Sequence, residues 1–435
     1  MPGEGFYGWP RPGADVRPLQ DLNQMGSLRD VIVLLGPGLE PWRCSRFEWK
    51  GDSITLVDRV EPVLAVEAGA MVVIPGMYNS HTHMGDSFLP DGATGLTLEQ
   101  GFFRPDGFKY RSLAAVTRES HLPHVVNHLR YMARTGTVCH IDFREQGPAG
   151  SELLREASRI AGVESVILGQ FSSVPFDGAE LSANVAPLPA TARGELDAIL
   201  SVADGFSEST MNDLTDAAWR EVREATAKHG KLRAIHCLEN AGYRDVSLGR
   251  TARGDLARAL DIYDPQLVVH MTVADKAEIA MLAASGKSAA LNPRANANVG
   301  LPMPPVRGLI ESGANLLLGT DNGLLNSPNM FAELDFTYKL AKSQYGDAVR
   351  PDPLVILRMA TSNIRSLLGG DHHGSLEPGS PATFVVIDFH QPHLRASRHI
   401  PASVVTRVTP EDVVATFRLG APLYEGERFS SWIDQ

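Results

Sequence analysis

The sequence predicts an α/β protein, a (β/α)8 TIM barrel with a small β-sandwich domain formed by both chain ends. Three observations support this prediction. The middle of the 435-residue chain alternates short apolar runs with helical segments, which is typical of βα units around a parallel sheet. There are eight such apolar runs, the number of strands that closes a TIM barrel. Both chain ends instead carry short, turn-separated strands rich in β-branched residues.

The eight apolar runs are the candidate barrel strands. In chain order they read VVIPG, TGTVCHIDFRE, VESVILGQF, ILSVADGFS, LRAIHCLE, PQLVVHMT, SAALNPR and NLLLGTD. From the change of pattern at each end, we expect residues 28–72 to form the first part of the small β domain, residues 73–371 the barrel, and residues 372–425 the second part of the small domain. Residues 1–27 are rich in Pro and Gly, and we expect them to wrap the surface.

Composition and charge narrow the classes of function. Hydrophobic residues make up 43% and charged residues 21%, which excludes a mainly disordered chain. Acidic residues outnumber basic ones by 51 to 40, so neither nucleic acid nor an anionic membrane is expected as a partner. Because the N-terminus lacks the pattern of a signal peptide and no apolar run is long enough to span a bilayer, we expect a cytoplasmic protein. The oligomeric state stays open, a homo-oligomer included.

The cysteines exclude one common kind of metal site. Cys44, Cys139 and Cys237 lie far apart, their number is odd, and no C-x-x-C pair occurs. Neither a disulfide framework nor a cysteine zinc site is therefore predicted.

Histidines and one aspartate stand at the ends of four predicted strands. His81 and His83 follow the run MVVIPG two residues apart, and alternate residues of a strand share a face, so both imidazoles can reach one ion. Such a pair arises easily by chance among 14 histidines and is weak evidence by itself. However, His236 ends LRAIH, His270 ends QLVVH, and Asp321 ends LLLGTD. Barrel strands converge at their ends, so these residues together predict a site with nitrogen and oxygen ligands.

A further carboxylate follows one of these strands. Glu239 lies three residues after His236. A carboxylate beside a metal-bound water can move a proton, which is the functional interpretation. The alternative is an exposed loop glutamate.

Several segments resemble the motifs of the amidohydrolase superfamily. IPGMYNSHTH resembles P-G-x-x-N-x-H-x-H, HCLE resembles H-x-x-E, LNPRANANVGLP resembles N-P-x-S-N-x-x-L-G, and LLLGTDNG resembles the G-T-D segment. SLEPGSPATFVVID is similar to the stretch that re-enters the small β domain. The resemblance covers about residues 30–425 and points to the branch of cytosine, guanine and adenosylhomocysteine deaminases and triazine hydrolases.

The resemblance implies a metal-dependent hydrolase that acts on C–N bonds other than ordinary peptide bonds. One divalent ion, zinc or alternatively iron, would be held by His81, His83, His236 and Asp321. Asp321 would also take a proton from the bound water, Glu239 would carry it to the leaving nitrogen, and His270 would orient the hydroxide or the substrate. Binuclear members carry a carboxylated lysine on the fourth strand. The equivalent stretch ILSVADGFSEST has no lysine, which favours one metal.

The departures from the motifs concern the substrate. Ala295 replaces the serine of N-P-x-S-N, and GSPATFVV lacks the aspartate usual there. Residues 84–112, after His83, do not resemble the corresponding deaminase segment and are broken by Gly and Pro. They form either a substrate lid or a packed surface loop. The candidate substrate contacts are Asn292, Phe102 and Phe103.

Several functions remain open at the level of the sequence. Deamination of an aminated heterocycle, a small-molecule substrate, is preferred. The alternative is amide or amidine hydrolysis in the maturation of a peptide natural product, such as follower-peptide removal in bottromycin biosynthesis, where the substrate is a modified peptide. A non-catalytic binding relative is less favoured, because every expected ligand residue is present.

Overall fold

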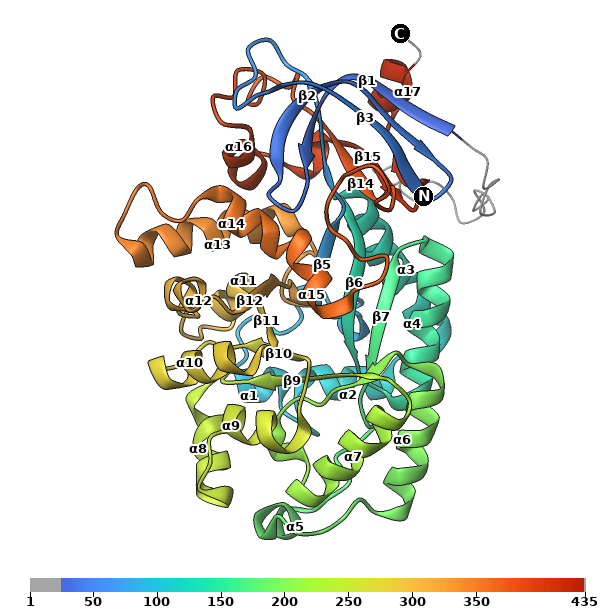
Figure 1. Ribbon diagram of the computed structural model, residues 1–435. Helices are drawn as coiled ribbons and strands as arrows, with labels where there is room; N and C mark the ends of the chain where they lie inside the picture. Colours follow the sequence, from blue (N-terminus) through green and yellow to red (C-terminus); the bar gives the residue numbers. More distant parts are fainter. Residues whose placement is uncertain (1–24, 434–435) are drawn as a thin grey trace.

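Two separate sheets organise the protein, as seen in a computed structural model that describes residues 25–433. Figure 1 shows a sheet built from both chain ends, in blue and red, beside a barrel of alternating strands and helices. The predicted fold class is confirmed. The sequence predicts that residues 1–27 wrap the surface, but residues 1–24 lie outside the described residues. The described chain begins with strand β1 (Met25–Leu35).

The barrel consists of parallel strands. In chain order these are β5 (Met77–His83), β6 (Thr137–Arg144), β7 (Glu164–Gly169), β8 (Gly205–Phe206), β9 (Leu232–Cys237), β10 (Leu267–His270), β11 (Ser288–Leu291), β12 (Asn315–Leu318) and β13 (Asp321–Asn322). β12 pairs with β11 and β13 pairs with β5, while only two residues separate β12 from β13. The two are therefore parts of one interrupted strand that closes the barrel.

Helices connect the strands and, apart from the last, which packs against the sheet of the chain ends, cover the barrel. They are α1 (Leu98–Phe102), α2 (Phe108–Ala115), α3 (Arg118–Arg134), α4 (Gly147–Ala161), α5 (Gly178–Ala183), α6 (Ala190–Val202), α7 (Asp216–Lys228), α8 (Ala241–Thr251), α9 (Asp255–Arg258), α10 (Lys276–Ser285), α11 (Pro293–Asn298), α12 (Val306–Ser312), α13 (Met330–Tyr345), α14 (Pro353–Met359), α15 (Arg365–Leu368), α16 (Ile400–Thr406) and α17 (Glu427–Ile433). Short turns of other helix types are η1 (Met84–Asp86), η2 (Met211–Asp213), η3 (Ala259–Tyr263), η4 (Ser362–Ile364) and η5 (Pro410–Asp412).

The sheet of the chain ends has the strand order β16-β15-β14-β4-β1-β2-β3. Its strands are β1 (Met25–Leu35), β2 (Glu40–Lys50), β3 (Ser53–Pro62), β4 (Met71–Pro75), β14 (Phe384–Asp388), β15 (Val413–Arg418) and β16 (Ala421–Glu425). Although β4 and β1 separate β14 from β2, the rings of Trp49 and Phe384 lie 5.0 Å apart. The sheet therefore curls until its two halves enclose an aromatic core, as the layers of a sandwich do.

Two predicted barrel strands are corrected by the structure. Most of the run VVIPG belongs to β4, which pairs with β1 and β14, and the first barrel strand is β5. β4 therefore crosses the predicted domain boundary between residues 72 and 73. In ILSVADGFS, residues 199–202 end α6 and only Gly205–Phe206 form a strand. A short, continuous apolar run suits a buried strand in either sheet or the end of a helix, so periodicity could not distinguish them.

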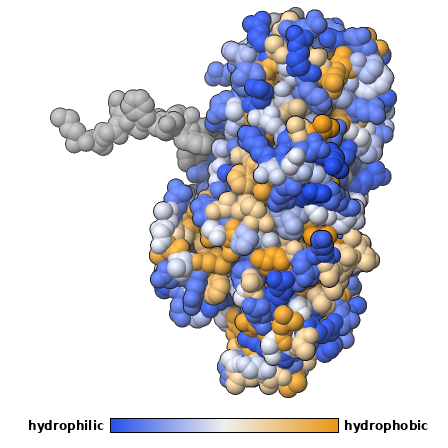
Figure 2. Space-filling view, turned by 90° about the vertical axis from the view of Figure 1, so that its left-hand side faces the viewer, coloured by the Kyte–Doolittle hydropathy of each residue, from blue (hydrophilic) through white to orange (hydrophobic). Residues whose placement is uncertain are grey.

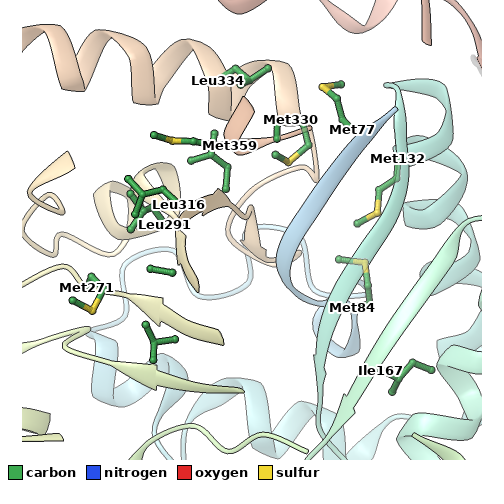
Figure 3. Close-up of a cluster of buried hydrophobic side chains, with 14 of the residues drawn as sticks. Met77, Met84, Met132, Ile167, Met271, Leu291, Leu316, Met330, Leu334 and Met359 are labelled. Carbon is green, nitrogen blue, oxygen red and sulfur yellow. The ribbon is translucent and has the colours of Figure 1, made fainter. Parts of the chain in front are cut away.

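Apolar side chains fill the barrel and the layer beneath its helices. Inside the barrel, Tyr78, Phe143 and Leu317 belong to one buried cluster. Figure 3 shows part of the outer layer, where side chains of the strands meet those of the surrounding helices. The residues labelled there are Met77, Met84, Met132, Ile167, Met271, Leu291, Leu316, Met330, Leu334 and Met359. The barrel strands are therefore close-packed on both faces.

On the face shown in Figure 2, hydrophobic side chains are interspersed among hydrophilic ones. Across residues 25–433, no helix combines the length and the apolar character that crossing a bilayer requires.

Candidate metal centre and active site

His81 and His83 reach the barrel mouth because the end of β5 is irregular. The pairing of β5 with β6 shifts register between Asn79 and Thr82, which re-aims the side chains that follow. The neighbouring strand must then pass very close to His81. A Cβ at Gly319 would lie 2.6 Å from the Cβ of His81, so only glycine allows this approach. The first and last barrel strands thus meet at the histidine pair.

Four side chains from three strand ends converge at this point. His83 Nε2 lies 3.3 Å from His236 Nε2. Asp321 Oδ1 lies 3.2 Å from His81 Nε2 and 3.7 Å from His83 Nε2. All four residues are at most 6% exposed. The convergence expected from the sequence is therefore present in the fold.

The outward ring nitrogens of two of these histidines are already engaged. His83 Nδ1 lies 2.7 Å from Glu145 Oε1, and His236 Nδ1 lies 3.0 Å from the backbone oxygen of Glu208. Both partners accept hydrogen bonds, so in its neutral form each imidazole carries its proton on Nδ1 and a lone pair on Nε2. Although burial and Lys109 act against the charged form, Glu145 and Asp321 raise the pKa of His83, so a cation would compete with a proton for its Nε2. Burial lowers the pKa of His236 well below its usual value, which keeps this imidazole neutral.

The inward atoms form a donor set for a cation. Two Nε2 lone pairs and the Asp321 carboxylate face one another, and such groups cannot hydrogen-bond to one another without a proton between them. Although burial opposes the charged form of Asp321, the nearby imidazoles of His81, His270 and His83 together outweigh it and hold the pKa of Asp321 far below its usual value. Both ring nitrogens of His81 are buried without a hydrogen bond. Three imidazoles and one carboxylate suit zinc or another divalent transition metal.

His270 joins the same cluster from β10 through an unusual backbone conformation. Val268 packs in the outer layer, so strict alternation would turn His270 outward as well. Instead its φ is 80°, in the left-handed region, and its ring centre lies 5.6 Å from that of His81. The amides of Asn292 and Asn296 are each 3.3 Å from its Nδ1. Strain of this kind, costing about 1–3 kcal/mol, is typical of functional sites.

Glu239 lines the pocket above the cluster, together with His270 and Asp321. The preceding Leu238 has a positive φ of 55° and its N–H is held by Asp255 Oδ2 at 2.8 Å, which turns the chain at the end of β9. Burial, with a smaller contribution from Asp321, raises the pKa of Glu239 to about 8. A carboxyl group with this pKa can give and take a proton near neutral pH.

Residues 84–112 border the pocket. This segment, which we interpreted as either a lid or a surface loop, contains η1, α1 and part of α2. Leu98, Phe102, Lys109 and Tyr110 line it from this segment. Phe103 does not line it but stacks on Tyr243, with ring centres 5.5 Å apart. Asn292 is fully buried behind His270 and lies outside the pocket lining. Of the three candidate substrate contacts, only Phe102 faces the pocket.

A charged network that the sequence analysis missed surrounds the histidines. Lys109 Nζ lies 2.5 Å from Glu145 Oε1 and 3.6 Å from Asp86 Oδ2. Arg104 donates from Nη1 to Glu208 Oε2 at 2.7 Å. Glu145 directly follows β6, so a carboxylate at a strand end was the signal that could have revealed it. Nothing local to the sequence marks the two cations.

A barrel with imidazoles and a carboxylate at its strand ends defines a class of barrel enzymes whose reactions take place at the mouth. The chain belongs to the amidohydrolase family, whose model matches residues 72–422. It is therefore a hydrolase of a metal-dependent family that acts on C–N bonds.

Known proteins resemble this chain over most of its length. A protein of Methanothermobacter thermautotrophicus, provisionally named an aminohydrolase, is 34% identical over 358 residues, which cover 82% of this chain and 89% of that protein. A 5-methylthioadenosine/S-adenosylhomocysteine deaminase of Syntrophobacter fumaroxidans is 26% identical over 341 residues, covering 76% of this chain and 75% of the deaminase. The crystal structure of an adenosine deaminase from Xanthomonas campestris with bound zinc has a TM-score of 0.77 at 21% identity and covers 92% of this chain and 93% of its own.

Proposed function

We propose that this protein deaminates an aminated heterocycle hydrolytically, using one zinc ion held by His81, His83, His236 and Asp321. The observation that carries the proposal is the 3.3 Å approach of the Nε2 atoms of His83 and His236. When both rings are neutral, both nitrogens present lone pairs, because the Nδ1 protons are donated elsewhere. A cation between them would then take the place of a shared proton. When bound, zinc would lower the pKa of a water molecule and so supply hydroxide near neutral pH.

The residues around the donor set have distinct roles in the proposed reaction. Asp321 stays ionised and can accept the proton that the attacking water loses. Glu239, with its pKa raised to about 8, is protonated at neutral pH and can donate to the leaving nitrogen as ammonia departs. His270 remains neutral because burial lowers its pKa to about 3, and it would orient the substrate by a hydrogen bond.

The choice of substrate class rests on the named relatives. The deaminase of Syntrophobacter fumaroxidans covers three quarters of this chain, and the Xanthomonas campestris deaminase that shares the fold carries zinc. Neither name refers to a peptide, so follower-peptide removal has no support from these relatives. Residues 84–112 depart from the corresponding deaminase segment and line part of the pocket, so the identity of the heterocycle stays open.

The test is an assay of the zinc-loaded protein against a panel of aminoheterocycles and peptide amides, in which released ammonia and the change in substrate mass are measured together. We expect at least one aminoheterocycle to lose one amino group with release of one ammonia. Release of ammonia or amine only from peptide amides would contradict the proposal. Protein stripped of metal by a chelator is the control and should be inactive.

A further inference from the structure

A buried lysine lies next to the candidate metal ligands and has no role in the reaction described above. Lys109 is 3% exposed, and it projects from α2, which begins in the segment of residues 84–112. Its Nζ is 2.5 Å from Glu145 Oε1, the same oxygen that lies 2.7 Å from His83 Nδ1. One carboxylate oxygen thus joins an ammonium group to an imidazole.

The buried charges of Lys109 and Glu145 depend on each other for stability. A buried ammonium or carboxylate is strongly disfavoured unless it is paired. Glu145 is 2% exposed, and its other oxygen has Arg144 Nη1 at 3.5 Å. Without Lys109, the carboxylate would lose its nearest cation and would shift from this position. That shift would weaken the hydrogen bond that fixes the His83 ring.

A second cation from the same segment, Arg104, is connected to His236 only through the side chain and backbone of Glu208. Arg104 pairs with Glu208 Oε2 at 2.7 Å and donates to Gln170 Oε1 at 2.8 Å. The backbone oxygen of Glu208 accepts from His236 Nδ1 at 3.0 Å. The side chain of Glu208 is also held by the N–H of Phe171 at 2.9 Å, so its backbone depends less on the cation.

We infer that Lys109 is a positioning residue that, through Glu145, holds His83 in the orientation and tautomer needed to bind a metal. The metal site is then complete only when α2 is docked on the barrel mouth. This inference rests on the proposed function, because it takes His83 as a metal ligand. Partners of this kind typically contribute about 10–100-fold to metal affinity.

The first experiment measures zinc affinity by competition with a chromogenic chelator. We expect Lys109→Met to bind zinc about 10–100-fold more weakly than the wild-type protein. Lys109→Arg keeps the charge and should recover part of the loss, which a purely structural role would not predict. Lys287→Met is the matched control, because Lys287 pairs with Asp264 at 2.6 Å outside this site, and its zinc affinity should equal that of the wild type. Arg104→Met should lose less affinity than Lys109→Met.

A second variant and a second measurement keep the inference testable if Lys109→Met does not fold. Glu145→Gln should weaken zinc binding as well, and its effect should not add to that of Lys109→Met, because both remove the same link. By linkage, zinc should slow hydrogen exchange of the amides in α2 in the wild type, and less so in Lys109→Arg. Wild-type affinity in Lys109→Met, or additive losses with Glu145→Gln, would overturn the inference while the proposed function stands. Failure of the wild type to bind zinc would overturn both.

Discussion

Asn79 and Thr320 join the first and last strands of the barrel by two buried hydrogen bonds. Asn79 Nδ2 donates to Thr320 Oγ1 at 2.7 Å, and the backbone N–H of Thr320 donates to Asn79 Oδ1 at 3.0 Å. Thr320 lies in the interruption between β12 and β13, where the strand ladder is broken. The asparagine of the N-x-H-x-H segment therefore closes the barrel next to His81.

Replacing this asparagine should destabilise the whole domain. Asn79→Ala leaves two buried groups of Thr320 without partners, so we expect a loss of about 2–4 kcal/mol in the free energy of unfolding. Urea denaturation measures it. The control is Asn298→Ala, whose side chain is exposed and donates to Leu325 O, and it should change stability by less than about 0.5 kcal/mol. Equal stability of the two variants would show that the barrel closes without this contact.

Removing one imidazole should remove the metal. His83→Ala deletes one of the two facing Nε2 atoms, so we expect the purified variant to contain little or no zinc by elemental analysis. His229→Ala, an exposed histidine at the end of α7, should retain the wild-type content. Full zinc content in His83→Ala would place the ion elsewhere. Because the ligands must be deprotonated, zinc affinity of the wild type should also fall in acid.

Glu239 should matter for turnover and not for metal content. Glu239→Gln keeps the size of the side chain but cannot transfer a proton, so we expect turnover to fall by about 10² or more. The measurement is the single-turnover rate beside zinc content, with a substrate found in the panel. Glu311→Gln, a change at an exposed surface pair with Arg307, is the control. Near-normal turnover in Glu239→Gln would end its assignment as the proton carrier.

A second buried carboxyl should make stability depend on pH. Glu333 is fully buried, and burial raises its pKa to about 8 despite the nearby Arg294. As pH rises from about 4.5 to 8, the unfolded state loses this proton before the folded state does, so the stability contributed by the neutral form is lost. Glu333→Gln should remove this decline and be more stable than the wild type at pH 8.5 by about 1–3 kcal/mol. Urea denaturation at pH 5 and pH 8.5 tests this. A constant difference between the two proteins would show that Glu333 does not titrate in this range.

Some parts of the site were accessible to sequence reasoning because their signal is local. His81, His83, His236, His270 and Asp321 each follow an apolar strand, and parallel strands bring such residues to one edge. The structure brings them together, although their roles in metal binding and catalysis stay predictions. By contrast, the prediction that VVIPG is a barrel strand was wrong, because an apolar run of that length fits both sheets.

The sequence by itself determined the alternation of strands and helices, the separate sheet of the chain ends and the polar residues at the strand ends. These follow from hydrophobic periodicity and from turns, which act between near neighbours. Only the tertiary structure decided that Lys109 meets Glu145, that Gly319 makes room for His81, and that Asn292 lies behind His270. Such pairings depend on how segments distant in sequence dock against one another, because buried charges and close contacts are satisfied by whichever partner the packing brings within reach.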